Sequence, residues 1–310
     1  MVRYILLLLL VTLSFPVLAL DELVNSTWLK ANMNTNNLFL LDIQQPEHYR
    51  RFHIPGSVNA PYIQWRSDKN SSAPGMLPPK KWLERFLGKL GISNDSAVVI
   101  IATGNQPADM AAAGRVFWTL KVIGHEKVAV LNGGLLGYAY LYPKDLEAIQ
   151  RLGTATSYKA TLNKNITFNA DNIQVSLQKK TQLLDARTLG EFVGVITAKP
   201  DERPGTIPSA KHLPYNWFVD SRGQIRDKKS VTTLFNAAGL NPTYDGTIHF
   251  CHSGNRASLT WFVDYAILGN RNAKLYDASM GEWAIQKGLP MEIGIDLKSS
   301  AKSPNNSKKR

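Results

Sequence analysis

The chain of 310 residues contains a single cysteine, Cys251. It follows a short apolar segment, residues 247–250, and precedes a segment with the apolar periodicity of a helix, residues 257–268. Between them lie Gly254 and Arg256, which suit a loop that holds an anion better than a core position. Backbone N–H groups that run into a helix N-terminus, with an arginine beside them, lower the pKa of a thiol. The pattern therefore predicts that Cys251 is a nucleophile and not only a small buried side chain.

Residues 1–19 have the pattern of a cleaved secretion signal. Arg3 precedes a long apolar run, and the run ends with Pro16 and the small residue Ala19. The run is short for a membrane span, which favours processing over an uncleaved anchor. We expect an exported protein, periplasmic or secreted, with no stable membrane anchor after cleavage. One cysteine cannot form an internal disulfide, so the thiol does not cross-link the fold in an oxidising compartment.

The formal charge of +12 could indicate a nucleic-acid partner, but it is unevenly spread. Without Arg3 and the five basic residues after Leu297 it falls from +12 to +6. The remaining excess forms no dense stripe of basic and aromatic residues, so no nucleic acid is expected as a partner. Residues 298–310, rich in Ser, Asn, Lys and Pro, are predicted to form a disordered basic tail. The sequence has no Cys/His cluster of the kind that binds a metal ion, so no metal site is expected, and no cofactor is expected either.

The two halves of the chain repeat one pattern. The matched segments are the strand patterns 38–42 and 182–185, the segments 53–61 and 206–214 that each end at a proline, the strand patterns 97–101 and 247–250, the helical patterns 108–123 and 257–268, and the strand-turn patterns 128–134 and 273–279. Alternating strands and helices predict an α/β fold, with two domains that each contain a mainly parallel sheet flanked by helices. We expect an N-terminal domain over 20–145, a linker over 146–169 and a C-terminal domain over 170–297, each with its own core.

The halves differ in the loop after the central strand. The second half has the cysteine loop, defined here as residues 251–256. The first half has residues 102–108 instead, with no thiol, no arginine and Pro107, which lacks an N–H group. The N-terminal domain is therefore expected to keep the fold without the chemistry.

The chain resembles the tandem-domain rhodanese family. The residues that carry the resemblance are Leu184–Arg187 with Glu191 and Phe192, the Ile207-Pro208 turn, the cysteine loop, Leu275–Trp283, and in the first half His53–Gly56 and Gly124–Gly134. The resemblance implies two rhodanese-like domains, the N-terminal one catalytically inactive and the C-terminal one active.

The resemblance also implies a sulfurtransferase reaction. The Cys251 thiolate would attack the sulfane sulfur of a small anionic donor such as thiosulfate, and a thiol, a protein thiol or a cyanide-type acceptor would then take sulfur from the resulting persulfide. The residues expected to bind the donor are His252, Ser253, Gly254, Asn255, Arg256 and Ala257. The residues expected to support the loop are Asp185, Arg187 and Glu191, with Asp185 and Arg187 pairing or capping structurally. His249 is assigned no proton transfer, and Trp283 is expected to pack in a core or between the domains.

Three other functions are weighed against this one. Phosphatases that share the fold place five residues between cysteine and arginine, whereas four lie between Cys251 and Arg256, so the loop should be too tight for a phosphate. Relatives that use 3-mercaptopyruvate carry further arginines, and Glu191 occupies the position of one of them, where an acid should repel a carboxylate donor. Thiosulfate is therefore favoured over 3-mercaptopyruvate. A third hypothesis is a sulfur-binding module that carries a persulfide with little small-molecule turnover.

Overall fold

The computed structural model describes residues 20–68 and 75–295, so the predicted signal segment and basic tail lie outside the described residues. The first domain contains a sheet of five parallel strands in the order β1-β5-β4-β2-β3. The strands are β1 (Leu23–Val24), β2 (Leu38–Asp42), β3 (Val58–Asn59), β4 (Ala97–Ile101) and β5 (Val128–Leu131). All five residues of β4 are buried, as expected for a central parallel strand covered on both faces.

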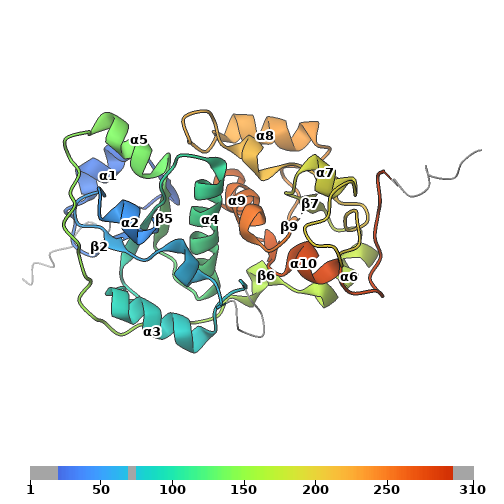
Figure 1. The fold of residues 1–310 in the computed structure, drawn as a ribbon, viewed down its shortest axis with the longest axis horizontal. Helices are drawn as coiled ribbons and strands as arrows, with labels where there is room; N and C mark the ends of the chain where they lie inside the picture. The colour runs from blue at the N-terminus through green and yellow to red at the C-terminus, as the bar shows by residue number, and fades with distance from the viewer. Residues whose placement is uncertain (1–19, 69–74, 296–310) are drawn as a thin grey trace, which may run out of the picture.

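The second domain repeats this topology, with strand order β6-β10-β9-β7-β8 and all pairs parallel. The strands are β6 (Thr167–Phe168), β7 (Leu183–Asp185), β8 (Lys211–His212), β9 (Ile248–Phe250) and β10 (Lys274–Tyr276). Each strand occupies the place of its counterpart five strands earlier. The predicted fold class, two mainly parallel sheets flanked by helices, is thus confirmed (Figure 1).

Helices connect the strands and cover both sheets (Figure 1). In the first domain they are α1 (Ser26–Asn32), α2 (Pro46–Tyr49), η1 (Tyr62–Trp65), α3 (Lys80–Leu90), α4 (Pro107–Val122) and α5 (Gly134–Leu141). In the second they are η2 (Lys164–Ile166), α6 (Ala170–Gln178), α7 (Leu189–Phe192), η3 (Tyr215–Phe218), α8 (Lys228–Ala237), α9 (Asn255–Phe262), η4 (Val263–Leu268) and α10 (Ser279–Trp283). Among these described helices, none is long and apolar enough to cross a membrane.

The two domains share a large hydrophobic cluster, so the expectation that each has its own core holds only for the outer faces of the sheets. Helices α4 and α9 lie side by side between the two sheets (Figure 1). Their backbones approach closely at Gly114, where a Cβ atom would lie 2.9 Å from the carbonyl oxygen of Ser258. The apolar residues of α4 and α9 belong to a single buried cluster that draws on both domains, while the outer face of each sheet has a smaller cluster of its own. Burial on several sides explains why α4 is apolar almost all round.

The segment predicted as a linker lies against the first domain for much of its length. The N–H groups of Thr156, Thr161 and Asn163 donate to carbonyl groups of the first domain at 2.7–3.0 Å. Its last residues belong to the second domain, because β6 pairs with β10 within the predicted range 146–169. The second sheet therefore begins before residue 170.

Candidate active site

Cys251 lies where β9 ends, at the carboxyl edge of the second sheet, which is the usual position for sites in parallel α/β folds. The side chain is buried, with 1% of the residue exposed. Its backbone N–H donates to Ser279 Oγ at 3.1 Å, and its carbonyl accepts from the N–H of Met280 at 3.0 Å. The turn after β10 therefore fixes the backbone of the cysteine through two hydrogen bonds.

The cysteine loop turns into α9 at Gly254, the N-cap residue of that helix. Gly254 has a φ angle of +73°, in the left-handed region that favours glycine. The first N–H groups of a helix have no partner within it, and the helix dipole adds positive potential at the same end. Gly254 thus directs the chain into a helix N-terminus three residues after the thiol, which is a suitable environment for a thiolate or persulfide.

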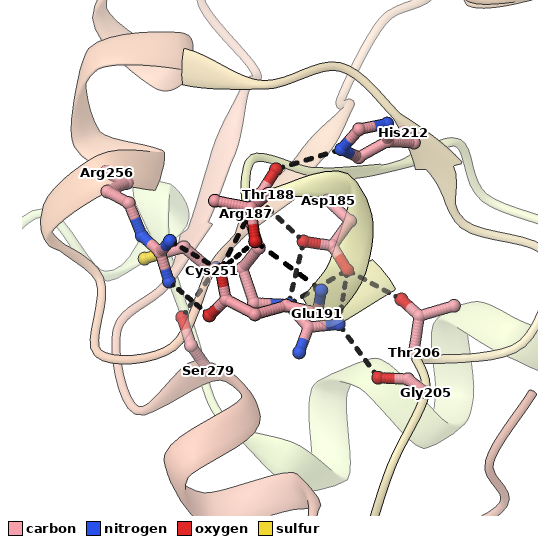
Figure 2. A network of polar contacts seen from close by, with 10 residues as sticks. All are labelled: Asp185, Arg187, Thr188, Glu191, Gly205, Thr206, His212, Cys251, Arg256 and Ser279. Carbon is pink, nitrogen blue, oxygen red and sulfur yellow. Dashed lines mark hydrogen bonds and ion pairs between the residues drawn. The ribbon is translucent and has the colours of Figure 1, made fainter. Parts of the chain in front are cut away.

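Arg256 is held by Glu191 of α7 in a two-pronged ion pair. Arg256 Nη1 and Nη2 each lie 2.7 Å from a carboxylate oxygen of Glu191. Thr188 completes the arrangement, since its N–H and hydroxyl both donate to Glu191 Oε2, at 3.1 and 2.7 Å. In the view of Figure 2 the Arg256 guanidinium overlaps the Cys251 sulfur, and the two groups interact electrostatically. The structure thus brings the predicted residues Cys251, Arg256 and Glu191 together.

The ion pair fixes the charge state of both partners. Burial raises the pKa of Glu191, but hydrogen bonds from Arg256 and Thr188 lower it by more, to about 2. Burial likewise lowers the pKa of Arg256, whereas Glu191 and Cys251 raise it, and the result is a pKa above its ordinary value. Arg256 neutralises Glu191 at contact, so a donor meets a nearly neutral pair. Glu191 therefore repels a carboxylate donor less than an unpaired acid at this position would.

We expect Glu191→Gln to destabilise the fold. Losing a buried charge-assisted pair should lower the free energy of unfolding by about 1.5–3 kcal/mol at neutral pH, measured by urea denaturation. The pKa of Glu191 is depressed on folding, so its stabilisation is complete above the ordinary value of 4.5 and is lost as the pH falls toward about 2. The difference between wild type and variant should therefore shrink over that range.

Glu47→Gln provides the control for this prediction. Glu47 also pairs with an arginine, Arg50, but at 3.5 Å and with both side chains more than half exposed. Exposed pairs contribute little, so this variant should lose less than about 1 kcal/mol. Equal losses in the two variants, or a loss for Glu191→Gln that does not vary with pH, would contradict a specific role for the Glu191–Arg256 pair.

Asp185 and Arg187 form a second buried pair close to the first. Arg187 Nη2 donates to Asp185 Oδ2 at 2.6 Å and to the carbonyl of Gly205 at 2.9 Å. Thr206 Oγ1 donates to the same Asp185 oxygen at 2.8 Å. These contacts tie the end of β7 to residues 205 and 206 (Figure 2), so both side chains serve the shape of the site in this structure.

The remaining members of the cysteine loop are fixed by residues far away in sequence. His252 Nε2 lies 2.8 Å from Glu202 Oε1. The carbonyl of Ser253 accepts from Arg66 Nη2 at 2.9 Å, and Asn255 Oδ1 accepts from the Tyr62 hydroxyl at 2.5 Å. Ala257, which follows the loop in α9, is fully buried. Arg66 and Tyr62 belong to the first domain, so that domain directly positions the loop.

His249 and Trp283 lie apart from this chemistry. Both ring nitrogens of His249 are engaged, with Thr260 Oγ1 at 3.0 Å and Asp264 Oδ2 at 2.9 Å. Trp283 is buried in the outer core of the second domain, and its Nε1 donates to the carbonyl of Pro290 at 2.9 Å. Packing and hydrogen bonding account for both residues.

Sequence reasoning missed five residues that contact the loop or its neighbours: Ser279, Glu202, Tyr62, Arg66 and Arg115. Two signals were present in the sequence. Ser279 lies within Leu275–Trp283, one of the segments that carry the family resemblance, and Arg115 is a lone charge near the middle of an apolar helical pattern. The other three carry no local signal, because the fold of the second domain brings Glu202 to the loop and the packing of the two domains brings Tyr62 and Arg66.

Comparison with known proteins agrees with this architecture. The family model for the rhodanese-like domain matches residues 25–140, within the first domain. A candidate thiosulfate sulfurtransferase of Mycobacterium leprae is 30% identical over 88% of this chain and 98% of its own length. Another, from Haloferax volcanii, is 27% identical over 89% of this chain and 98% of its own. The crystal structure of SseA from Escherichia coli, a 3-mercaptopyruvate sulfotransferase, is 25% identical, with a TM-score of 0.72 over 84% of this chain and 98% of SseA.

The two parallel sheets, the repeated topology and these similarities define the class: the chain belongs to the rhodanese family. It is a tandem-domain member and a sulfurtransferase. The family and the enzyme class predicted from the sequence are therefore confirmed.

Proposed function

We propose that the protein transfers sulfane sulfur from thiosulfate to a thiol or cyanide-type acceptor through a persulfide on Cys251. The Cys251 thiolate attacks the outer sulfur of thiosulfate, the S–S bond of the donor breaks, and its electron pair leaves with sulfite. An acceptor thiolate or cyanide then attacks the outer sulfur of the persulfide, and the Cys251 thiolate leaves. The observation that carries this proposal is the placement of Cys251 beside Arg256, at the start of a loop that runs into the N-terminus of α9.

Each group around the thiol has a part in this reaction. The unpaired N–H groups at the start of α9 would stabilise the negative charge of the thiolate and of the persulfide. Arg256 would donate the N–H groups that Glu191 does not engage to the donor's oxygens and stabilise charge as sulfite departs, while Glu191 holds its guanidinium in place. Glu202 orients His252 at the edge of the loop, where the imidazole can also contact an anionic donor.

The names of the sequence relatives support thiosulfate, and the similarity to SseA supports 3-mercaptopyruvate as the second candidate donor. The two are separated by measuring sulfite released from thiosulfate and pyruvate released from 3-mercaptopyruvate, at equal donor concentrations and with one dithiol acceptor. Faster sulfite release supports the proposal, and faster pyruvate release overturns the choice of donor. Persulfide formation without turnover on either donor would favour the sulfur-carrying module.

Thiosulfate treatment is expected to add the mass of one sulfur atom to the intact protein. The addition should disappear with a thiol reductant, because a persulfide sulfur is reducible whereas a sulfonate is not. Intact-protein mass spectrometry before and after reduction measures both steps. A folded protein with a free thiol that gains no mass would rule out the persulfide.

Export to the periplasm or outside the cell is part of the proposal, supported by the signal pattern of residues 1–19. Expression of the full chain in a bacterium, followed by fractionation and N-terminal sequencing, tests it. A mature protein outside the cytoplasm that begins at Leu20 agrees with the proposal. A cytoplasmic protein that keeps residues 1–19 contradicts it.

A further inference from the structure

Arg115 is a buried cation in the middle of α4, the first-domain helix at the domain interface. Its side chain is 0% exposed. Nη1 lies 2.5 Å from Asp277 Oδ1, and the guanidinium lies 4.6 Å from the centroid of the Trp118 ring. Nε and Nη2 have no hydrogen-bond acceptor among the described residues. Such a group is costly to bury, so its presence in an apolar helix calls for a function.

Arg115 lies against the cysteine loop. A Cβ atom on Gly254 would be 2.5 Å from Arg115 Nη1 and 2.6 Å from Asp277 Oδ1. Only a glycine leaves space for the ion pair at this point of the loop. The guanidinium of an inactive domain is thereby brought against the backbone three residues from the nucleophile.

Asp277 shares its carboxylate between Arg115 and the backbone. One of its oxygens contacts Arg115, and the other accepts from the N–H of Leu77 at 2.8 Å. Burial lowers the pKa of Arg115, but Asp277, Tyr62 and Cys251 raise it by more, so the pKa lies above its ordinary value. The side chain stays charged, and Cys251 lies within reach of its field.

We propose that Arg115 is a positioning residue of the active site, whose buried charge stabilises the anionic forms of Cys251 through the loop at Gly254. The first domain contains no cysteine, and on this proposal it supplies a fixed cation to the nucleophile of the second. The inference rests on the proposed function, because it concerns the charge that Cys251 carries during sulfur transfer. It assigns no contact with the donor to Arg115.

Several ionisable groups contact the loop or its flanks, and their charges also influence the titration of Cys251. They are Arg115 and Asp277 at Gly254, Arg66 and Tyr62 from the first domain, Glu202 beside His252, and Glu191 beside Arg256. Arg256 is paired through both of its terminal nitrogens, whereas Arg115 uses only one for its pair. We therefore expect the Cys251 thiolate to become less stable when the charge of Arg115 is removed, even though Arg256 remains.

The test is the pH dependence of Cys251 alkylation by iodoacetamide, which reports the pKa of the thiol without any sulfur transfer. Arg115→Met should raise that pKa and slow alkylation roughly tenfold at neutral pH, because the thiolate loses a nearby cation. Asp277→Asn should lower it, because Arg115 stays charged and loses its counter-charge, while the amide oxygen can still accept one of the two hydrogen bonds. The alkylation rate of Arg115→Lys should stay closer to the wild-type rate than that of Arg115→Met, because lysine keeps the positive charge.

Lys121→Met is the matched control, since Lys121 is also a buried, ion-paired cation on α4, with Glu22 and Glu126 as partners. It should leave the thiol titration unchanged. The proposal is overturned if folded Arg115→Met titrates like wild type, or if Arg115→Met and Asp277→Asn shift the pKa in the same direction, as general damage to the loop would do. If Arg115→Met does not fold, the expected downward shift in Asp277→Asn decides. Failed sulfur transfer in the wild type would refute the proposed function and leave this titration intact.

Discussion

Cys251→Ser is expected to abolish sulfur transfer while the protein stays folded. A serine hydroxyl is close in size to the thiol, and no disulfide depends on this residue. At neutral pH, however, the hydroxyl is neither ionised nor able to hold a second sulfur as a persulfide. The rate of sulfite release from thiosulfate should fall by about 1,000-fold or more.

The variant must be shown to be folded before its rate is interpreted. Circular dichroism and the urea midpoint should match wild type, since the backbone contacts of residue 251 to Ser279 and Met280 do not involve the thiol. Retention of more than a trace of the wild-type rate would remove Cys251 from the role of nucleophile. Thiosulfate should also add no sulfur to this variant.

Arg256→Ala should have the next largest effect on the reaction. Loss of a charge-assisted contact of about 1.5–3 kcal/mol corresponds to roughly a ten- to 150-fold lower kcat/KM for thiosulfate. The change should raise KM and also slow persulfide formation, because the guanidinium would hold the donor and stabilise the departing sulfite. Steady-state kinetics and single-turnover sulfite release measure the two parts.

The structure shows that this single variant is ambiguous. Removing Arg256 leaves Glu191 as a largely buried carboxylate without its partner, and stability falls for that reason alone. The double variant Glu191→Gln with Arg256→Ala removes both charges. It should recover stability but not activity. Recovery of activity in the double variant would mean that Arg256 acts only by neutralising Glu191.

Part of this protein could be predicted from the sequence alone. The repeated alternation of strand and helix patterns is a local property, and it indicated two parallel sheets that the structure confirms. The candidate nucleophile could also be predicted from the sequence, because Cys251, Gly254 and Arg256 lie within six residues and their types suffice to indicate an anion-binding loop. The lack of a thiol in residues 102–108 indicated an inactive first domain in the same local way.

Contacts between distant residues were decided only by the tertiary structure. The sequence showed Glu191 near the site but not its pairing with Arg256, 65 residues away, and that pairing changes how its charge acts on a donor. The expectation of separate cores holds only for the outer faces of the sheets, because α4 and α9 bury their apolar faces against each other as well as against their own sheets. The same packing carries Tyr62, Arg66 and Arg115 to the cysteine loop. Local periodicity specifies strands and helices, but only the close packing of whole domains determines which side chains meet between them.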